Sequence, residues 1–266
     1  MEKWNREKTL KILAIGNSFS DDALWLLPDI LKSLGIRKFR VSNLYIGGCV
    51  LKTHSENIDS DAPAYEFRTN TGNGWETEFN TTLYTGLVAD EWNFITFQQG
   101  SPDSGKRETY SYLAPVIDFV KKYRPSAKLG WQMTWAYQQD SNHGAFADYD
   151  CDQTTMYNAV VSAVKSEIAT NKSIEFVVPN GTAIQNARTS YLGDTLTRDG
   201  FHMSYDIGRF ITALSYARLI TGYSLDEVTF APDGVDENAK RVCIESVKNA
   251  IINPYLVTKS TYNAKP

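Results

Sequence analysis

Short, almost continuously apolar segments alternate along this chain with segments of helical periodicity, and this alternation constrains the fold more than any other feature. The first apolar segment covers residues 10–15, and the helical segment after it places Leu24, Leu27, Ile30 and Leu31 on one face. Strands without polar alternation are buried on both sides, and strands separated by helices favour a parallel sheet. The sequence therefore predicts an α/β fold, a three-layer sandwich around a parallel sheet.

The whole chain can be divided in this way. Predicted strands cover residues 10–15, 39–46, 94–97, 129–135 and 174–178, and predicted helices cover residues 21–34, 83–88, 110–123, 154–169, 205–220 and 238–252. Because crossovers are right-handed, few arrangements remain, and we expect a five-stranded sheet in the flavodoxin-like order 2-1-3-4-5. Residues 51–80 are polar, aromatic and turn-rich, with a tight turn or hairpin near residues 71–75, and predict an insertion at the edge that binds ligands. We expect residues 1–266 to form a single domain.

A serine and two groups of polar or small residues follow the first three predicted strands. Ser18 stands where the first strand gives way to a helix, Gly47 and Gly48 follow the second strand, and Gln98 and Gln99 follow the third. Parallel strands bring these positions to one edge of the sheet, where backbone N–H groups and a helix dipole favour an anion. Acyl transfer needs a nucleophile, a base and donors for an oxyanion, and this edge offers them.

Of the three histidines, His54, His143 and His202, we take His202 as the candidate base. It lies three residues after Asp199, so the carboxylate can reach the imidazole. A lone D-x-x-H is more often a surface contact, and a lone serine or glycine more often caps a helix or forms a turn. Together with Ser18, however, the pair supplies a nucleophile, its base and the acid that orients the base.

Four short blocks of the sequence resemble those of the SGNH (GDSL-like) hydrolase superfamily. They are Gly16–Ser20, Gly47–Gly48, Gln98–Ser101 and Asp199–His202, in the same order as in that superfamily. The first block, G-N-S-F-S, is similar to that of a bacterial branch of these proteins.

The resemblance implies a three-layer α/β fold and the hydrolysis of an ester, often an acetyl or acyl group on a carbohydrate or lipid. It also implies that Ser18 is the nucleophile, His202 the base and Asp199 its orienting acid. By the same resemblance, the N–H groups of Ser18 and Gly48 form part of the oxyanion hole.

The chain departs from the superfamily pattern at two positions. Asn17 stands where the first block usually has aspartate, and the third block lacks the G-x-N-D that supplies an asparagine to the oxyanion hole. Gln99, Gly100 and Ser101 are instead similar to the Q-G-E variant of sialate-O-acetylesterase-like carbohydrate esterases. This implies that Gln99 is the third oxyanion donor, with Gln98 as the alternative.

Three further residues are candidate substrate contacts. His54 follows Gly48 closely, His143 lies in a polar loop after the fourth predicted strand, and Trp135 ends that strand, where it could stack on a sugar ring. Each has a structural alternative, because histidines often make ordinary hydrogen bonds and strand-end tryptophans often belong to the core.

Composition excludes several other classes of protein. A net charge of −4 gives no case for nucleic acid or for an anionic membrane, and no apolar run approaches the ~18 residues of a membrane span. Three distant cysteines without C-x-x-C spacing predict neither disulfides nor a metal site, and no dinucleotide-binding glycine motif suggests a cofactor. The first eight residues are charged rather than apolar, which predicts a cytoplasmic protein, or a secreted or periplasmic one if a leader once preceded them.

These observations favour a serine esterase that removes small acyl groups, above all acetyl, from a carbohydrate. The expected partner is a small-molecule or oligosaccharide ester. Two alternatives stay open at this point: an acyltransferase that uses the same residues, and a carbohydrate-binding protein without catalysis.

Overall fold

The computed structural model describes residues 2–264, and its centre is one sheet of seven strands in the order β4-β3-β2-β1-β5-β6-β7. The strands are β1 (Leu10–Gly16), β2 (Phe39–Tyr45), β3 (Tyr65–Asn70), β4 (Trp75–Thr81), β5 (Phe94–Phe97), β6 (Lys128–Gln132) and β7 (Phe176–Val178). β2, β1, β5, β6 and β7 run parallel and correspond to the five predicted strands in the predicted order.

The predicted number of strands is wrong, because the sheet has seven strands and not five. The two additional strands, β3 and β4, come from the insertion at residues 51–80. β3 pairs antiparallel with β2, and β4 pairs antiparallel with β3. β4 is largely exposed at the edge of the sheet, so its sequence carries polar and charged side chains on both faces. Edge strands of this kind lack the apolar pattern by which the central strands were recognised.

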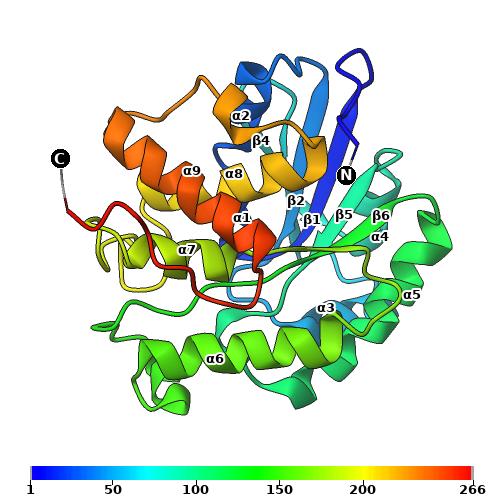
Figure 1. The fold of residues 1–266 in the computed structure, drawn as a ribbon. Coiled ribbons are helices and arrows are strands. Elements are labelled where there is room, and N and C mark those ends of the chain that lie inside the picture. The colour runs from blue at the N-terminus through cyan, green and yellow to red at the C-terminus, as the bar shows by residue number, and fades with distance from the viewer. Residues whose placement is uncertain (1, 265–266) are drawn as a thin grey trace.

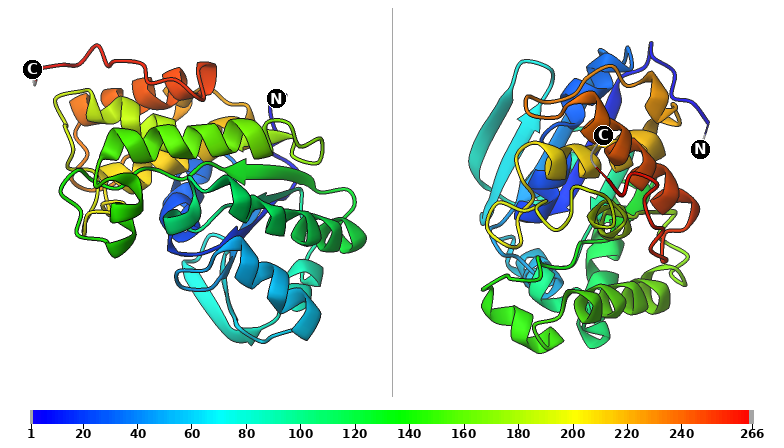
Figure 2. Two further views of the ribbon diagram at one scale, coloured as in Figure 1. Left: turned by 90° about the horizontal axis from the view of Figure 1, so that it is seen from below. Right: turned by 60° about the vertical axis from the view of Figure 1, so that its left-hand side comes forward.

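Helices cover both faces of the sheet (Figure 1). They are α1 (Ser18–Leu24), α2 (Leu27–Ser33), α3 (Leu51–Ser60), α4 (Leu83–Val88), α5 (Leu113–Tyr123), α6 (Gln153–Ala163), α7 (Asn180–Arg188), α8 (Ile207–Thr221) and α9 (Glu237–Ile252). α1, α2, α7, α8 and α9 lie on one face and α3 to α6 on the other, which the views of Figure 2 also show. The fold is thus α/β with one central sheet between two helical layers.

The helices differ from the prediction where local sequence is ambiguous. The first predicted helix is two helices, since α1 ends at Leu24 and Pro28 stands in the first turn of α2, where proline is well tolerated. α3 and α7 were not predicted, because their sequences are mostly polar.

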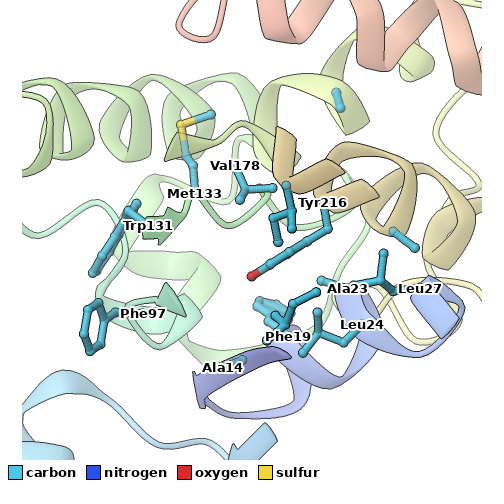
Figure 3. Packing of buried hydrophobic residues seen from close by; sticks show 14 of the residues in the cluster. Ala14, Phe19, Ala23, Leu24, Leu27, Phe97, Trp131, Met133, Val178 and Tyr216 are labelled. Atoms are coloured by element: carbon cyan, nitrogen blue, oxygen red, sulfur yellow. The ribbon is translucent and has the colours of Figure 1, made fainter. Parts of the chain in front are cut away.

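The layer between the sheet and α8 contains buried side chains from both α1 and α8. Figure 3 shows Phe19 and Leu24 of α1 and Tyr216 of α8 over the sheet, and all three are buried. Removing a side chain of this size from water stabilises a fold by about 1.5–3 kcal/mol. The Tyr216 hydroxyl donates to Gln132 Oε1 at the end of β6 (2.7 Å), so this layer also fixes the position of α8. Among residues 2–264, no helix has the length and apolar character needed to cross a membrane.

Candidate active site

Ser18 stands at the first position of α1, directly beyond the carboxyl end of β1. Asn17 caps the helix, because its side-chain oxygen accepts the N–H of Phe19 at 2.9 Å. The Asn17 amide nitrogen donates to the carbonyl of Cys49 at 2.8 Å and so joins this turn to the loop after β2. Ser18 is half-buried, and its backbone N–H belongs to the first turn of a helix, where such groups lack carbonyl partners within the helix.

The predicted triad residues form a continuous chain of hydrogen bonds. His202 Nε2 lies 2.8 Å from Ser18 Oγ, and His202 Nδ1 lies 2.7 Å from Asp199 Oδ2. The other carboxylate oxygen, Asp199 Oδ1, accepts the N–H of His202 at 2.8 Å and that of Phe201 at 3.2 Å. The structure therefore brings Ser18 together with the Asp199–His202 pair, which lies more than 180 residues later in the sequence.

Asp199 remains ionised over a wide pH range. Its partial burial acts to raise the pKa of the carboxyl group, but the hydrogen bonds from the His202 ring and from two backbone N–H groups outweigh this effect and hold the pKa below its usual value. An ionised carboxylate on Nδ1 favours the proton on that nitrogen, which leaves Nε2 free to accept a proton from Ser18.

Gly48 lies in an exposed turn beside this site. Its φ of 65° is in the left-handed region that favours glycine, and an added Cβ would meet no atom within 4 Å. The next residue, Cys49, is bonded through its carbonyl to Asn17, so the Gly47–Gly48 turn is fixed against the turn that carries Ser18. This position is compatible with the predicted role of Gly48 as an oxyanion donor.

The contacts of Gln99 differ from its predicted role. Its side-chain oxygen accepts the N–H groups of Leu51 and Gly100, each at 2.9 Å, and its nitrogen donates to Thr109 Oγ1 at 2.8 Å. Leu51 is the first residue of α3, and no side chain of the preceding residue caps that helix. Gln99 therefore binds the start of α3, and its contacts are at odds with donation to an oxyanion.

Gln98 also belongs to a buried network. Its nitrogen donates to Asn17 Oδ1 at 2.7 Å, and its oxygen accepts the side-chain N–H of Gln132 at 3.1 Å. The Gln98 side chain thus supports the residue that caps α1.

Two of the three predicted substrate contacts are buried instead. His54 is almost completely buried, with Nδ1 3.0 Å from the Tyr65 hydroxyl, and burial lowers the pKa of His54 to about 4. Trp135 is fully buried, packs on Phe19 with a ring separation of 4.3 Å, and donates its indole N–H to the carbonyl of Phe201 at 2.7 Å. Neither side chain is accessible for stacking on a substrate, and both instead hold the structure around the site.

His143 is compatible with its predicted role. Its half-buried ring lies 4.7 Å from the ring of Phe201, the residue before His202. Nδ1 accepts the N–H of Ala145 at 3.2 Å, which places the proton of the neutral ring on Nε2. Desolvation and the nearby His202 lower the pKa of His143, so the neutral form is favoured. Among residues 2–264, no cluster of three or more His, Cys, Asp or Glu side chains could hold a metal ion.

Asp22, Arg198 and Arg209 form a charged group next to the triad that the sequence did not reveal. Asp22 is fully buried and pairs with both arginines. Its position one helical turn after Ser18 is the only sequence signal for its location, and acidic residues in a first helical turn usually have an ordinary explanation.

A family can be assigned with this geometry in view. The sequence profile of the family described as a domain of unknown function (DUF4886) matches residues 11–250. The chain belongs to this family. The crystal structure of a DUF4886 family protein from Bacteroides uniformis is similar to it, with 36% sequence identity, a TM-score of 0.92, and coverage of 97% of this chain and 100% of that chain.

More distant solved structures share the fold. A protein from Slackia heliotrinireducens, described as a candidate SGNH hydrolase, has 18% identity and a TM-score of 0.50 over 81% of this chain and 100% of that chain. An acetyl xylan esterase from Geobacillus stearothermophilus has 14% identity and a TM-score of 0.52 over 79% of this chain and 94% of that chain. No curated protein matches the sequence. This DUF4886 chain therefore has an SGNH hydrolase-like fold, and its structural neighbours include hydrolases and esterases.

Proposed function

We propose that this protein is a serine esterase in which Ser18 is the nucleophile. The observation that carries the proposal is the hydrogen-bonded chain from Ser18 Oγ to His202 Nε2 (2.8 Å) and from His202 Nδ1 to Asp199 Oδ2 (2.7 Å). These contacts supply a nucleophile, a base within reach of its proton, and an acid that orients the base. The site lies at the carboxyl ends of the parallel strands, where α/β proteins bind ligands.

The mechanism follows from these contacts. Ser18 Oγ attacks the ester carbonyl while His202 Nε2 takes its proton, and the N–H groups of Ser18 and Gly48 stabilise the negative charge on the carbonyl oxygen. His202 then gives the proton to the leaving alkoxide, which departs as an alcohol and leaves an acyl group on Ser18. Water, deprotonated by His202, attacks the acyl group, and the acid is released as the proton returns to Ser18.

We infer that the substrate is a small acyl ester, above all an acetyl ester, of a carbohydrate. Exposed aromatic side chains lie near the triad residues in the sequence: Tyr205 comes three residues after His202, and Trp25, at the end of α1, stacks on Trp75 of β4 at 5.6 Å. Aromatic faces of this kind suit the apolar faces of sugar rings. The acetyl xylan esterase with the same fold acts on an acetylated carbohydrate and supports this choice of substrate.

The nucleophile can be tested with a fluorophosphonate probe and a panel of acetylated sugars and p-nitrophenyl esters of increasing acyl length. We expect the probe to label Ser18, and Ser18→Ala to abolish both labelling and hydrolysis with an unchanged melting temperature. Ser20→Ala is the matched control, because Ser20 lies in the same helix but its hydroxyl is buried against Asn17 O and Asn43. An adduct on another serine would refute the assignment, and a kcat/KM that rises beyond butyryl esters would refute the preference for acetyl.

Ester hydrolysis is distinguished from the two alternatives by the products. Transfer of the acyl group to an added sugar, in preference to water, would indicate an acyltransferase. If the wild-type protein binds a sugar without turnover, and Ser18→Ala binds that sugar equally well, the chain is a binding protein.

A further inference from the structure

We propose that Asp22 is the positioning residue of the triad: its carboxylate fixes the helix that carries Ser18 against the loop that carries Asp199 and His202. The inference rests on the proposed function, since it concerns the geometry of the same site. Asp22 touches none of the three reacting groups, and it acts on them through the backbone on either side.

The carboxylate of Asp22 accepts hydrogen bonds from three directions. Oδ1 accepts from the guanidinium groups of Arg198 (2.9 Å) and Arg209 (2.8 Å), and Oδ2 accepts the backbone N–H of Met203 (2.9 Å). Asp22 is fully buried, so water does not compete for these bonds. Charge-assisted hydrogen bonds in a desolvated site are short and strongly directional.

The positions of these partners in the chain explain why the contact matters. Met203 is the residue after His202, and Arg198 is the residue before Asp199, so the two partners flank the acid–base pair. Asp22 lies four residues after Ser18, and residues four apart lie on the same face of a helix. One carboxylate therefore holds the two ends of the Asp199–His202 loop and the turn of α1 that starts with Ser18.

Arg198 binds the far end of this loop as well as Asp22 of α1. Its backbone N–H donates to the carbonyl of His202 at 2.9 Å, and its guanidinium donates to the carbonyl of Met203. Thr197 and Met203 form an isolated antiparallel bridge beside these bonds. The two ends of the loop are thus hydrogen-bonded to each other, and Asp22 binds both ends.

The middle of the loop is held by hydrogen bonds between uncharged groups. The indole of Trp135 donates to Phe201 O, and the N–H of Gln138 donates to Gly200 O at 2.8 Å. These contacts fix the middle of the loop to the segment that follows β6. The charged bonds of Asp22 fix its ends to α1, and the separation of Ser18 Oγ from His202 Nε2 depends on that connection.

The two arginines provide a matched pair for the test. Both lose an ion pair with the same carboxylate when they are changed to methionine, and both rest on the ring of Tyr205 (4.8 and 4.7 Å). Arg209 belongs to α8 and is the more buried of the two, whereas Arg198 belongs to the loop of the triad. If the charged group only stabilises the fold, replacing the more buried Arg209 should lower both kcat and the melting temperature more than replacing Arg198 does.

We expect the two variants to rank in opposite order in activity and stability. Arg198→Met should lower kcat by about 10²-fold with KM changed by less than about threefold, because small displacements of reacting groups cost rates of this size. Arg209→Met should lower the melting temperature at least as much and kcat by less than about threefold. Arg198→Lys, which keeps the charge, should recover part of kcat. Equal losses of kcat in the two arginine variants, in step with their melting temperatures, would overturn the proposal.

A second measurement does not depend on turnover. In proton NMR, the Nδ1 proton of His202 bonded to Asp199 gives a downfield signal, which His202→Ala identifies by its loss. We expect Arg198→Met to broaden or shift this signal and Arg209→Met to leave it in place. An unchanged signal in Arg198→Met refutes the positioning role. If the wild-type protein turns over no ester and reacts with no fluorophosphonate, the proposed function fails, and this signal still decides whether Asp22 orders the triad.

Discussion

Two histidines of this chain lie at the same end of the sheet in opposite environments. His202 has a carboxylate at Nδ1 and a serine hydroxyl at Nε2, and its side chain is partly open to solvent. His54, in the insertion, binds a tyrosine hydroxyl at Nδ1, is almost completely buried, and has no hydrogen-bond partner at Nε2 among the described residues.

The difference shows what an imidazole needs to serve as a base. Burial alone lowers the pKa of His54 to about 4 and keeps its ring neutral, but nothing near it stabilises a positive charge. In the proposed mechanism, by contrast, the Asp199 carboxylate stabilises the imidazolium that His202 becomes when Ser18 gives up its proton. The insertion therefore uses a histidine to build a core, whereas the histidine at the edge of the parallel sheet is placed to act as the proposed base.

The most direct test of this difference is to replace each histidine in turn. His202→Ala should lower kcat by roughly 10⁶-fold, as the loss of the base does in a serine protease. His54→Ala should keep kcat within about tenfold of the wild type and lower the melting temperature through a cavity under α3. Ester turnover and thermal unfolding of both variants check this. A comparable loss of kcat in His54→Ala would mean that the insertion contributes to catalysis.

A smaller effect is expected from changing Asp199, the carboxylate that His202 has and His54 lacks. Asp199→Asn retains the shape of the side chain but stabilises the wrong tautomer of His202, so kcat should fall by about 10⁴-fold. The matched control is Asp194→Asn, an acid of a nearby loop that pairs with Arg188 and not with a histidine. The pH profile of kcat/KM should change only in Asp199→Asn, and an equal change in the control would remove the special role of Asp199.

Replacing Gln99 tests whether its side chain stabilises the start of α3 or donates to an oxyanion. Gln99→Ala leaves the N–H groups of Leu51 and Gly100 without an acceptor, and each buried orphan costs about 1–3 kcal/mol. We expect a lower free energy of unfolding in urea, with kcat within about tenfold of the wild type. An oxyanion donor would behave differently: its loss would lower kcat by roughly 10²–10³-fold at nearly constant stability.

The smallest expected effect is the response of stability to acid. The pKa of His54 falls from its ordinary 6.5 to about 4 in the folded protein, so the unfolded chain binds the proton more tightly. Folding stability is therefore lost as the pH drops below 6.5, by about 2 kcal/mol at pH 5 from this residue. Urea unfolding at pH 7 and pH 5 should show this loss, and His54→Gln should abolish it. His143→Gln should abolish less of it, since that ring is only half-buried.

The fold was predictable wherever burial imposes a pattern. The five parallel strands are apolar because helices cover both of their faces, and their order follows from right-handed crossover connections. β3 and β4 escaped prediction because an edge hairpin exposes most of its side chains. α7 escaped it because its nine residues, NGTAIQNAR, contain few apolar residues although most of them are buried.

The site was predictable to the extent that its residues follow strands. Ser18 and Gly48 come directly after strands, and the spacing of Asp199 and His202 matches a hydrogen-bonded pair. The contacts of Gln99 could not be predicted, because they depend on α3, whose existence the sequence did not reveal. Asp22 is similar, since its partners lie more than 170 residues away and only the tertiary structure shows that they meet.

The separation of Ser18 from His202 by 184 residues has a consequence for the newly made protein. A ribosome that adds about 5–20 residues per second needs roughly 10–40 s to pass from one residue to the other. During that interval β1 can pair with β2, but the serine has neither its base nor the charged contact that holds the base in place. Under the proposed function, the nascent chain stays inert toward esters until His202 has emerged, and fragments that end before His202 should accumulate without hydrolytic activity.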